Sequence, residues 1–420
     1  MEKTVSISVV SFILTIFVPL SLGYLLSYLY RTINAALAPH LMEAFGFDAS
    51  ALGVLTSSYL FAFALMQVPL GLLIDRYGVR WVQGINLLVA ALGAVIFALA
   101  DDLGLLMLGR ALIGAGVAVS LMSSFASFII WLPPQRVPMA MGFLMAFGGL
   151  GAVLAGAPVE ATIQWIGWRN SFLLLAALTV LVALLVLLVL PDRKRQVRTS
   201  WSSLLAGLAL VYRTPLFWRV VPLAIFTCGT GFALQGLWAG LWLSDVAGLG
   251  QDAVALHLSA IALGLLVGSI ACGPMAALAA RFGLSLLGLV GLLAAVFLVI
   301  LAALALGFVK FALPLWVLVG FLINPLSLSY VALAQSFESE MAGRANTAVN
   351  LLVVLGSFAI QASLGWVLDL WDRPDGIHYP LEAYGVGFGS LALIGVATLV
   401  WFLLGLSGQK GRSGADRVGV

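Results

Sequence analysis

The chain has 420 residues, of which 63% are hydrophobic and only 9% are charged, and its mean hydropathy is +1.14. About a quarter of the residues of a soluble globular domain are charged, so this composition excludes that class and predicts a polytopic membrane protein. The net charge of +3 comes mostly from loops. We interpret it as a topology signal and not as affinity for nucleic acid.

Charge and turn signals divide the chain into twelve apolar segments, each long enough to cross about 30 Å of hydrocarbon as a helix. The expected spans are residues 16–42, 50–74, 80–100, 103–131, 138–163, 169–190, 216–245, 254–280, 283–307, 311–336, 344–369 and 382–406. A short basic region precedes the first span, as in a signal peptide. The apolar run is too long for one and has no convincing Ala-x-Ala cleavage site, so we predict a retained first span.

The spans form two groups of six. We expect an N-terminal bundle over residues 1–190, a cytoplasmic linker over 191–215, a C-terminal bundle over 216–406 and a cytoplasmic tail over 407–420. The linker holds a basic run, which we interpret as a topology anchor, followed by a short interfacial helix from Trp201 to Tyr212. A six-plus-six layout with polar groups in the middle is typical of transporters built from repeats, which bind substrate near the midplane between the halves.

The basic residues predict the orientation. If both termini are cytoplasmic, fifteen basic residues fall inside and three, Arg169, Lys310 and Arg373, fall outside. The positive-inside rule favours this arrangement. The inside set is Lys3, Arg76, Arg80, Arg136, Arg193, Lys194, Arg195, Arg198, Arg213, Arg219, Arg281, Arg344, Lys410, Arg412 and Arg417.

Arg31 lies inside the first span, roughly 12 Å below the outer end of the helix when counted back from Pro39. A guanidinium at mid-depth costs from ~3 to above ~10 kcal/mol, which a water-filled cavity, a carboxylate or an anionic ligand must offset. Tyr24, Tyr28 and Asn34 share its helical face. Two interpretations stay open: Arg31 binds an anionic substrate, or it is a structurally paired or hydrated lining residue.

Several motifs resemble those of the major facilitator superfamily. The segment Gly71 to Arg80 (GLLIDRYGVR) is similar to its G-x-L-x-D-R-x-G-R/K-R loop, and Arg281 to Gly283 (RFG) is a degenerate copy in the second half. Gly109 to Gly116 (GRALIGAG) resembles the R-x-x-x-G-x-G motif of span 4, and Gly167 to Phe172 (GWRNSF) resembles the start of span 6. The resemblance implies an all-α membrane protein with twelve helices in two pseudo-symmetric six-helix bundles, and spans 1, 2, 4, 5, 7, 8, 10 and 11 around a central cavity.

The first of these loops has a readable physical chemistry. Gly71 would let two helices approach closely, and Gly78 permits a tight turn. Asp75, Arg76 and Arg80 can form a charge network that holds the halves together on the cytoplasmic side. The resemblance suggests Arg344, at the start of span 11, as the cross-half partner, in a contact that stabilises the outward-open state. The alternative is that Arg344 pairs with Glu338 or Glu340 beside it.

The pattern Tyr28-x-x-Arg31-x-x-Asn34 is similar to that of organophosphate:phosphate antiporters and of sialin-type and hexuronate-type anion symporters. There the span-1 arginine binds the phosphate or carboxylate of the substrate, and a planar fork of donors suits either group. Span 7 has no second arginine but only Gln235. One cation opposite one amide favours a monoanion over a phosphate dianion.

Three further amides are candidates for the site. Asn350 and Gln361 in span 11 are eleven residues apart and share one helical face, and Asn324 precedes a mid-span proline in span 10. Coupling to a proton would need a titratable group at the cavity. Glu160 and His257 lie toward the outer ends of their spans, and Arg110, at a motif position associated with proton handling in related antiporters, does not itself release a proton.

We therefore expect a secondary active transporter for a small organic anion, in a plasma membrane, most simply a bacterial inner membrane. A drug or metabolite efflux antiporter coupled to protons and a transporter-like sensor are the alternatives. No nucleotide-binding loop, catalytic constellation or metal-ligand spacing is present, so we expect no enzyme activity and no cofactor. The expected partners are the substrate, the lipid bilayer and a coupling proton or counter-anion, with the protein as a monomer.

Overall fold

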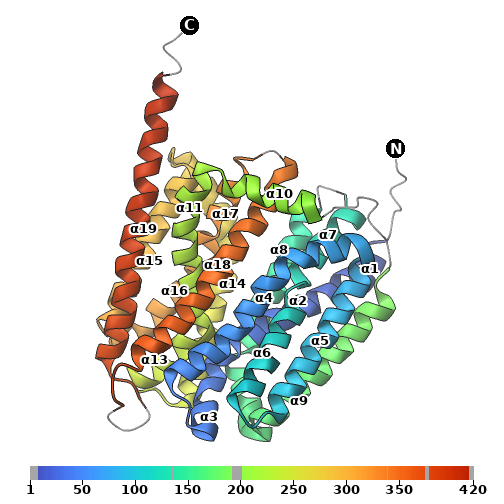
Figure 1. Cartoon of the computed structure of the whole chain (residues 1–420), viewed down its shortest axis with the longest axis vertical. Coiled ribbons are helices and arrows are strands. Elements are labelled where there is room, and N and C mark those ends of the chain that lie inside the picture. Colours follow the sequence, from blue (N-terminus) through green and yellow to red (C-terminus); the bar gives the residue numbers. More distant parts are fainter. Residues whose placement is uncertain (1–7, 134–135, 192–200, 338, 374–377, 416–420) are drawn as a thin grey trace.

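The computed structural model describes residues 8–133, 136–191, 201–337, 339–373 and 378–415. These residues are almost entirely helical and include no strand (Figure 1). Some residues named above lie outside these ranges: Lys3, the basic run Asp192–Arg198, Glu338 and Arg417. The side chains of Glu340, Lys410 and Arg412 are also not described.

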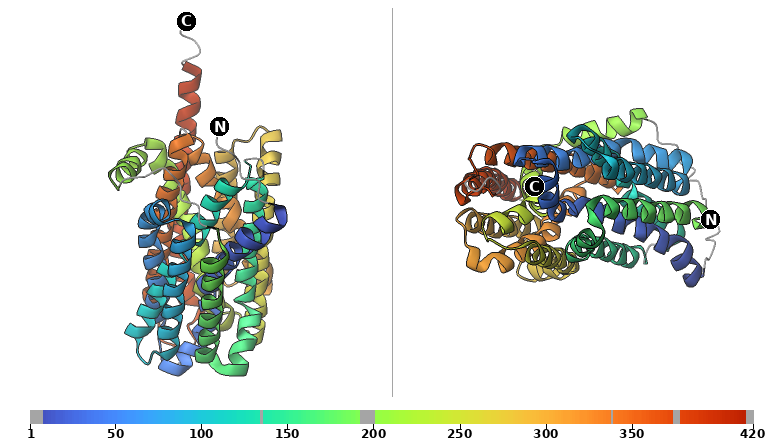
Figure 2. Two further views of the ribbon diagram at one scale, coloured as in Figure 1. Left: turned by 90° about the vertical axis from the view of Figure 1, so that its right-hand side faces the viewer. Right: turned by 90° about the horizontal axis from the view of Figure 1, so that it is seen from below.

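The first half of the molecule runs to the end of α9. Its elements are α1 (Val9–Phe12), the π-helix η1 (Ile13–Phe17), α2 (Val18–Thr32), α3 (Asn34–Phe45), α4 (Ala49–Tyr77), α5 (Val79–Leu99), α6 (Leu103–Val117), α7 (Ser120–Trp131), α8 (Val137–Leu154) and α9 (Ala157–Val189). The helix α10 (Trp201–Tyr212) follows and has the bounds that the aromatic pattern predicted. It lies to one side of the bundles, at the end of the molecule that we call the linker face (Figure 2).

The second half repeats the plan. Its elements are α11 (Pro215–Ala224), the π-helix η2 (Ile225–Gly229), α12 (Thr230–Ala233), the π-helix η3 (Leu234–Trp238), α13 (Ala239–Asp245), α14 (Gln251–Arg281), α15 (Leu286–Ala305), the 3-10 helix η4 (Val309–Phe311), α16 (Ala312–Leu326), α17 (Leu328–Ala334), α18 (Ser339–Leu368) and α19 (Leu381–Ala415). The end of the molecule opposite the linker face, where α4 and α14 begin, is called the far face.

Among the described residues, eleven helical segments are long and apolar enough to cross a membrane. The expected fifth span is the shorter one: its apolar part, Met139–Leu154 in α8, continues after a break into the first turns of α9. The chain reverses inside α9 at Gly167, where φ is +80°. The twelve-span plan of the fold is therefore confirmed, with span 5 divided between two helices.

Helical irregularities are concentrated in particular spans. Span 1 contains η1 and a turn at Ile33, span 4 breaks after Val117, span 7 contains η2 and η3, and span 10 breaks at Ser327 after Pro325. By contrast α5, α15 and α19, the expected outer spans 3, 9 and 12, are continuous. Non-helical backbone inside a membrane is tolerated where it is covered by protein or lines a cavity. The breaks thus fall in spans that were expected to surround the cavity.

Two pairs of glycines mark the internal repeat. Gly46 and Gly248 end the first span of each half with positive φ angles of 67° and 64°. Gly78 and Gly283 occupy the following loop of each half, with φ angles of 82° and 70°. These conformations favour glycine because a Cβ would be strained there. The expected tight turn at Gly78 is confirmed, and its degenerate copy at Gly283 has the same backbone handedness.

The two halves pack closely toward the far face and diverge toward the linker face. On α8, a Cβ built at Gly149 would lie 2.9 Å from a methyl carbon of Leu266 in α14. Gly142 and Gly273, two helical turns nearer the linker face on the same helix faces, have nothing within 4 Å of such a Cβ. The separation of α8 and α14 therefore increases along their length.

Candidate substrate-binding site

Arg31 lies near the end of α2, where aromatic rings from both halves surround it. Its guanidinium carbon is 5.1 Å from the ring centroid of Tyr28 and 4.9 Å from that of Phe63 in α4. The ring of Phe232, from α12 in the second half, lies 5.2 Å away. A cation over an aromatic face gains about 2 kcal/mol or more when desolvated, so these rings offset part of the cost of placing a guanidinium inside a membrane.

The polar contacts of Arg31 leave donors available. Its Nε is buried without a hydrogen-bond partner. Tyr59 lies close to the guanidinium and donates its own hydroxyl to the carbonyl of Ser27 at 3.2 Å, so its oxygen can only accept from Arg31. Within the described ranges, no carboxylate lies within ion-pair distance of Arg31. The positive charge is thus not neutralised by the protein that surrounds it.

The aromatic face of span 1 packs against α8. Tyr24 packs edge-on to Tyr28 with ring centroids 5.1 Å apart, and its hydroxyl donates to the sulfur of Met145 in α8 at 3.4 Å. A Cβ built at Gly148 of α8 would lie 2.6 Å from the ring of Tyr24 and 3.0 Å from that of Tyr28. Gly148 therefore lets both tyrosine rings lie against α8, beside Arg31.

Gln235 lies in the π-helix η3, which packs against α2. A Cβ built at Gly236 would lie 3.8 Å from the backbone oxygen of Arg31 and 3.6 Å from Oε1 of Gln361. The structure thus brings Gln235, Arg31 and Gln361 into one region between the halves. Asn34 begins α3 directly after the turn at Ile33, and both Asn34 and Gln235 are buried. Of the described residues, none forms a side-chain hydrogen bond with either amide.

The remaining amides from the sequence are hydrogen-bonded to protein. Gln361 donates to Thr56 and Asn350 donates to Gln67 at 3.4 Å, and both bonds join α18 to α4 across the halves. Asn324 donates to the carbonyl of Leu265 at 3.2 Å and to Ser269, within the second half. In this conformation, the first two amides link the halves, and Asn324 ties α16 to α14.

Arg110 lies deep inside the first half and is fully buried. Its Nη1 donates to the backbone oxygen of Tyr30 at 3.3 Å, and its guanidinium carbon lies 4.7 Å and 5.2 Å from the rings of Phe97 and Phe172. Its Nε and Nη2 have no hydrogen-bond partner among the described residues. Arg110 is therefore bonded to the residue that precedes Arg31 but is enclosed by its own bundle.

The charged loop residues lie at the linker face, apart from this site. A Cβ built at Gly71 would meet nothing within 4 Å, so the expected close helix approach at Gly71 is wrong for this conformation. Arg76 is exposed, with its guanidinium 5.3 Å from the ring of Tyr77, and Arg80 lies 5.7 Å from the ring of Trp81. Asp75 precedes Arg76 in the last turn of α4.

Arg344 contacts a segment that its sequence pattern did not indicate. Its side chain lies across Gly207 of α10 and occupies the space that a Cβ would need there. The cross-half contact between Arg344 and Asp75 stays a prediction for the conformation in which the linker face closes.

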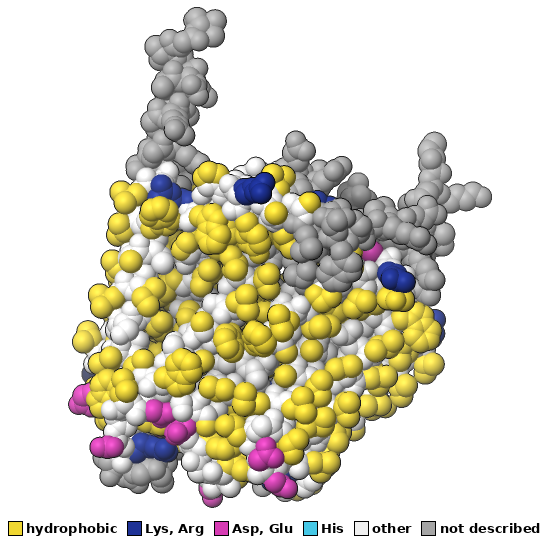
Figure 3. Space-filling view, in the orientation of Figure 1, with side chains coloured by type: hydrophobic (Ala, Val, Ile, Leu, Met, Phe, Trp, Pro, Cys, Tyr) yellow, Lys and Arg dark blue, Asp and Glu magenta, His cyan; other side chains and the backbone are white. Residues whose placement is uncertain are grey.

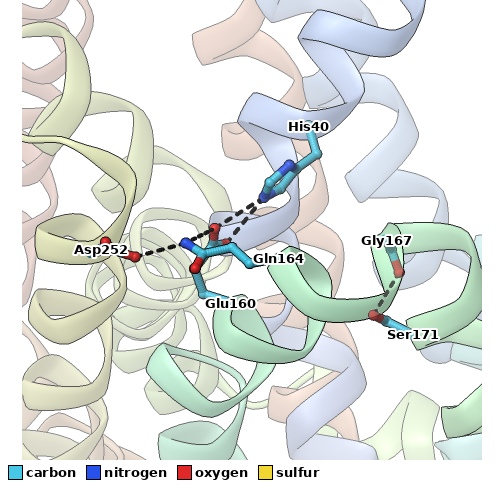
Figure 4. Close-up of polar contacts among 6 residues, drawn as sticks. All are labelled: His40, Glu160, Gln164, Gly167, Ser171 and Asp252. Carbon is cyan, nitrogen blue, oxygen red and sulfur yellow. Dashed lines mark hydrogen bonds and ion pairs between the residues drawn. The ribbon is translucent and has the colours of Figure 1, made fainter.

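A polar cluster joins the halves at the far face (Figure 4). Both carboxylate oxygens of Glu160 in α9 lie near Nε2 of His40 in α3, at 3.2 Å and 3.1 Å. Gln164, one turn after Glu160, donates to Glu160 at 3.2 Å and to Asp252 of α14 at 2.7 Å. A contact between the halves is thus connected to a part-buried His–Glu pair.

A second far-face contact caps a helix from across the interface. The carboxylate of Asp369, after α18, accepts from the backbone N–H groups of Ala49 and Ser50 at the start of α4, at 3.2 Å and 2.8 Å. Tyr379 donates to Asp369 and lies 2.9 Å from the nitrogen of Ala49. Sequence reasoning missed Asp369, Asp252 and the rings of Phe63 and Phe232, because each acts through a residue that is distant in the sequence and lies on another element.

Two six-span halves that face each other across a half-buried arginine with no described carboxylate beside it have the architecture of an alternating-access membrane transporter. A family model described as the Major Facilitator Superfamily matches residues 20–361, and the chain belongs to this superfamily. The protein is therefore a multi-pass membrane protein of this superfamily.

Three relatives illustrate the range of proteins that this chain is similar to. A probable sulfoacetate transporter, SauU of Cupriavidus necator, is 26% identical over 158 residues, which is 38% of this chain and 37% of that protein. A hexuronate transporter of Escherichia coli is 27% identical over 164 residues (39% and 38%). A putative multidrug resistance protein, MdtD of Shigella boydii, is 26% identical over 189 residues (45% and 40%). The matched region thus spans about two-fifths of the length of these relatives.

Solved structures of low sequence identity share the fold. A point mutant of the nucleoside transporter NupG is 15% identical with a TM-score of 0.76, and the match covers 92% of this chain and 99% of that one. A bacterial homologue of the lysosomal transporter Spinster, in an inward-facing and unoccupied conformation, is 18% identical with a TM-score of 0.72, covering 92% and 94%. These likenesses confirm the twelve-span, two-bundle architecture.

Proposed function

We propose that the protein is a secondary transporter that carries a small organic monoanion by alternating access, with Arg31 binding the anionic group. The observation that carries the proposal is the surroundings of Arg31: a guanidinium between the halves, with a buried Nε that lacks a partner and no described carboxylate within ion-pair distance. An anionic ligand would supply the missing charge, because a charge inside a membrane is stabilised by a partner.

The charge of the substrate follows from the number of cations at this depth. Arg110 also lies well inside a span, unlike the arginines at span ends, and it is enclosed in its own bundle by Phe97 and Phe172. Arg31 is thus a single accessible cation, and a monoanion such as a carboxylate or a sulfonate balances it. The relative named a hexuronate transporter agrees with this charge class, whereas sulfoacetate, in the name of SauU, is a dianion at neutral pH.

The orientation of the protein is part of the proposal. Most Lys and Arg side chains visible in Figure 3 lie toward the linker face, and most visible Asp and Glu side chains lie toward the far face. By the positive-inside rule, the linker face is cytoplasmic. Both termini are then cytoplasmic, a bacterial inner membrane is the expected location, and the conformation described here is open to the cytoplasm. A coupling proton or a counter-anion would drive transport.

Proton-coupled efflux of apolar drugs is the second candidate, and one observation favours it. The three rings around Arg31 form an apolar surface that a neutral drug could occupy, and MdtD is named a putative multidrug resistance protein. This function would not need the positive charge of Arg31. The charge of residue 31 therefore separates the two candidates.

The test is uptake into proteoliposomes by Arg31→Lys and Arg31→Gln, with membrane insertion measured in parallel. Both variants should lose most transport of organic anions, because lysine keeps the charge but lacks the planar fork of donors. Both should insert normally, since Arg31→Lys keeps the charge and Arg31→Gln removes an unpaired charge, which does not destabilise a span. Near-normal transport by Arg31→Gln would contradict the proposal and favour the efflux candidate.

A further inference from the structure

We propose that the substrate is a monocarboxylate with an apolar, planar body, such as an aromatic acid, and not a polyhydroxylated sugar acid or a dicarboxylate. The inference rests on the proposed function, which makes Arg31 the binder of the anionic group. It adds the chemistry of the rest of the ligand, which follows from what surrounds the guanidinium.

Aromatic rings form the walls of the site around Arg31. The rings of Tyr28, Phe63 and Phe232 lie within 5.2 Å of the guanidinium carbon and come from spans 1, 2 and 7. Tyr24 packs on Tyr28, and Tyr59 stacks on Phe63 with ring centroids 6.0 Å apart. A ligand whose carboxylate reaches Arg31 must place its body beside these rings. Aromatic surfaces bind flat apolar bodies through stacked or edge-to-face contacts.

A sugar acid would need polar partners in the site for its hydroxyl groups. Each hydroxyl group of such a ligand must recover the hydrogen bonds that it loses on leaving water, because an unpaired buried polar group is unfavourable. The amide NH₂ groups of Gln361, Asn350 and Asn324 are already bonded to Thr56, Gln67 and Ser269. Of the candidate amides in the described residues, Gln235 and Asn34 are without such bonds. These two amides can bond only some of the several hydroxyl groups of a sugar acid.

The second carboxylate of a dicarboxylate would find no second cation among the described residues of the site. It would have to lie within the site without a cation of its own, since Arg110 is fully buried inside the first half behind Phe97 and Phe172. An isolated charge in a low-dielectric region is strongly unfavourable. A single carboxylate on an apolar body fits both the one available cation and the aromatic walls.

Phe232 has a separate role in this inference because it belongs to the second half. Its ring contacts the guanidinium of the first half across the interface. A ligand body that stacks on both Phe63 and Phe232 would touch both halves at once. Loss of either ring should then lower the affinity for an aromatic acid. The affinity for a hydrophilic anion should stay nearly unchanged.

The experiment is equilibrium binding of benzoate, glucuronate and succinate to the purified full-length protein, measured by calorimetry. Benzoate should bind at least tenfold more tightly than glucuronate or succinate. Phe63→Leu and Phe232→Leu should each lower the affinity for benzoate severalfold and change the affinity for glucuronate less than twofold. Phe311→Leu, in the exposed η4 segment, is the matched control and should bind all three anions like the unmodified protein.

The outcomes separate this inference from the proposed function. If glucuronate or succinate binds as tightly as benzoate, and Arg31→Gln abolishes that binding, the apolar-body inference is overturned while the anion carrier stands. If Phe63→Leu and Phe232→Leu lower the affinity for all three anions equally, the rings do not select the ligand and the inference is also overturned. If no anion shows binding that depends on Arg31, the proposed function itself fails.

Discussion

The far-face and linker-face ends of the interface between the halves are built differently. Toward the far face, hydrogen bonds cross the interface at Asp369, Gln164 and Gln361, and glycines bring the helices together. Toward the linker face, Gly71, Gly142 and Gly273 have open space beside them. The described contacts thus hold one end of the interface shut while the helices diverge at the other.

The free energy needed to switch between the two open states of the protein is comparable with that of a few such contacts. A typical protein hydrogen bond contributes about 1 kcal/mol net, and those to charged groups about 1.5–3 kcal/mol. Shifting a two-state equilibrium from 1:99 to 99:1 takes roughly 5.5 kcal/mol. A few far-face hydrogen bonds, set against a few linker-face ion pairs, are therefore enough to set the balance, and single substitutions should move it measurably.

The largest effect is expected at Asp369. Asp369→Ala removes the acceptor for Ala49, Ser50 and Tyr379 and so uncaps α4 from across the interface. Ala49 keeps Tyr379 as an acceptor, so the net loss across the interface is one bond to a charged group, about 1.5–3 kcal/mol. This loss should reduce the linker-face-open population relative to the far-face-open one roughly 10- to 100-fold. Spin-label distances across both faces would measure the change. The exposed Asp372, three residues later, supplies the control: Asp372→Ala should leave the distances unchanged.

A pair of glycines on α8 should shift the equilibrium in opposite directions. Gly149→Leu places a side chain against Leu266, so it should disfavour far-face closure by about 1–3 kcal/mol. Gly142→Leu, two turns away, meets open space here and should disfavour closure of the linker face. Cysteine accessibility on each face would report both shifts. Equal shifts in the same direction would show that the two faces do not alternate.

The smallest effect is expected at Asp75. Asp75→Asn should weaken the predicted charge network of the linker face and favour the linker-face-open state by less than about fivefold, because surface ion pairs contribute about 0–1 kcal/mol. Asp101→Asn, at the exposed far-face pair with Arg169, is the control. Unchanged spin-label distances across the linker face in Asp75→Asn would remove the cross-half network from the account.

The sequence was sufficient for most of the fold. Apolar segments, turn residues and the loop motif predicted the twelve spans, and the bounds of α4, α5 and α10 agree within about three residues. The turn at Gly78 follows from local chemistry, which a sequence displays directly. The break in span 5 was harder to anticipate, because Gly156 and Pro158 do not by themselves distinguish a kink from a continuous helix.

Only part of the candidate site could be predicted from the sequence. Arg31, Tyr24 and Tyr28 share a helix face, which helical spacing makes visible. Phe63 and Phe232 belong to other spans, and one apolar ring among many gives no sign that it faces a guanidinium. Three candidate amides form hydrogen bonds with residues that are distant in the sequence: Asn324 with Ser269, Asn350 with Gln67 and Gln361 with Thr56. Asp369 resembled an ordinary loop carboxylate until its place at the start of α4 was known.

Binding of a monocarboxylate as a function of the residue at position 31 tests the central claim most directly. Calorimetric titration of benzoate into the unmodified protein, Arg31→Lys and Arg31→Gln separates binding from transport kinetics. We expect saturable binding to the unmodified protein that weakens at least tenfold in Arg31→Lys and is lost in Arg31→Gln, with all three proteins folded. Anion binding of the same affinity in Arg31→Gln would contradict it.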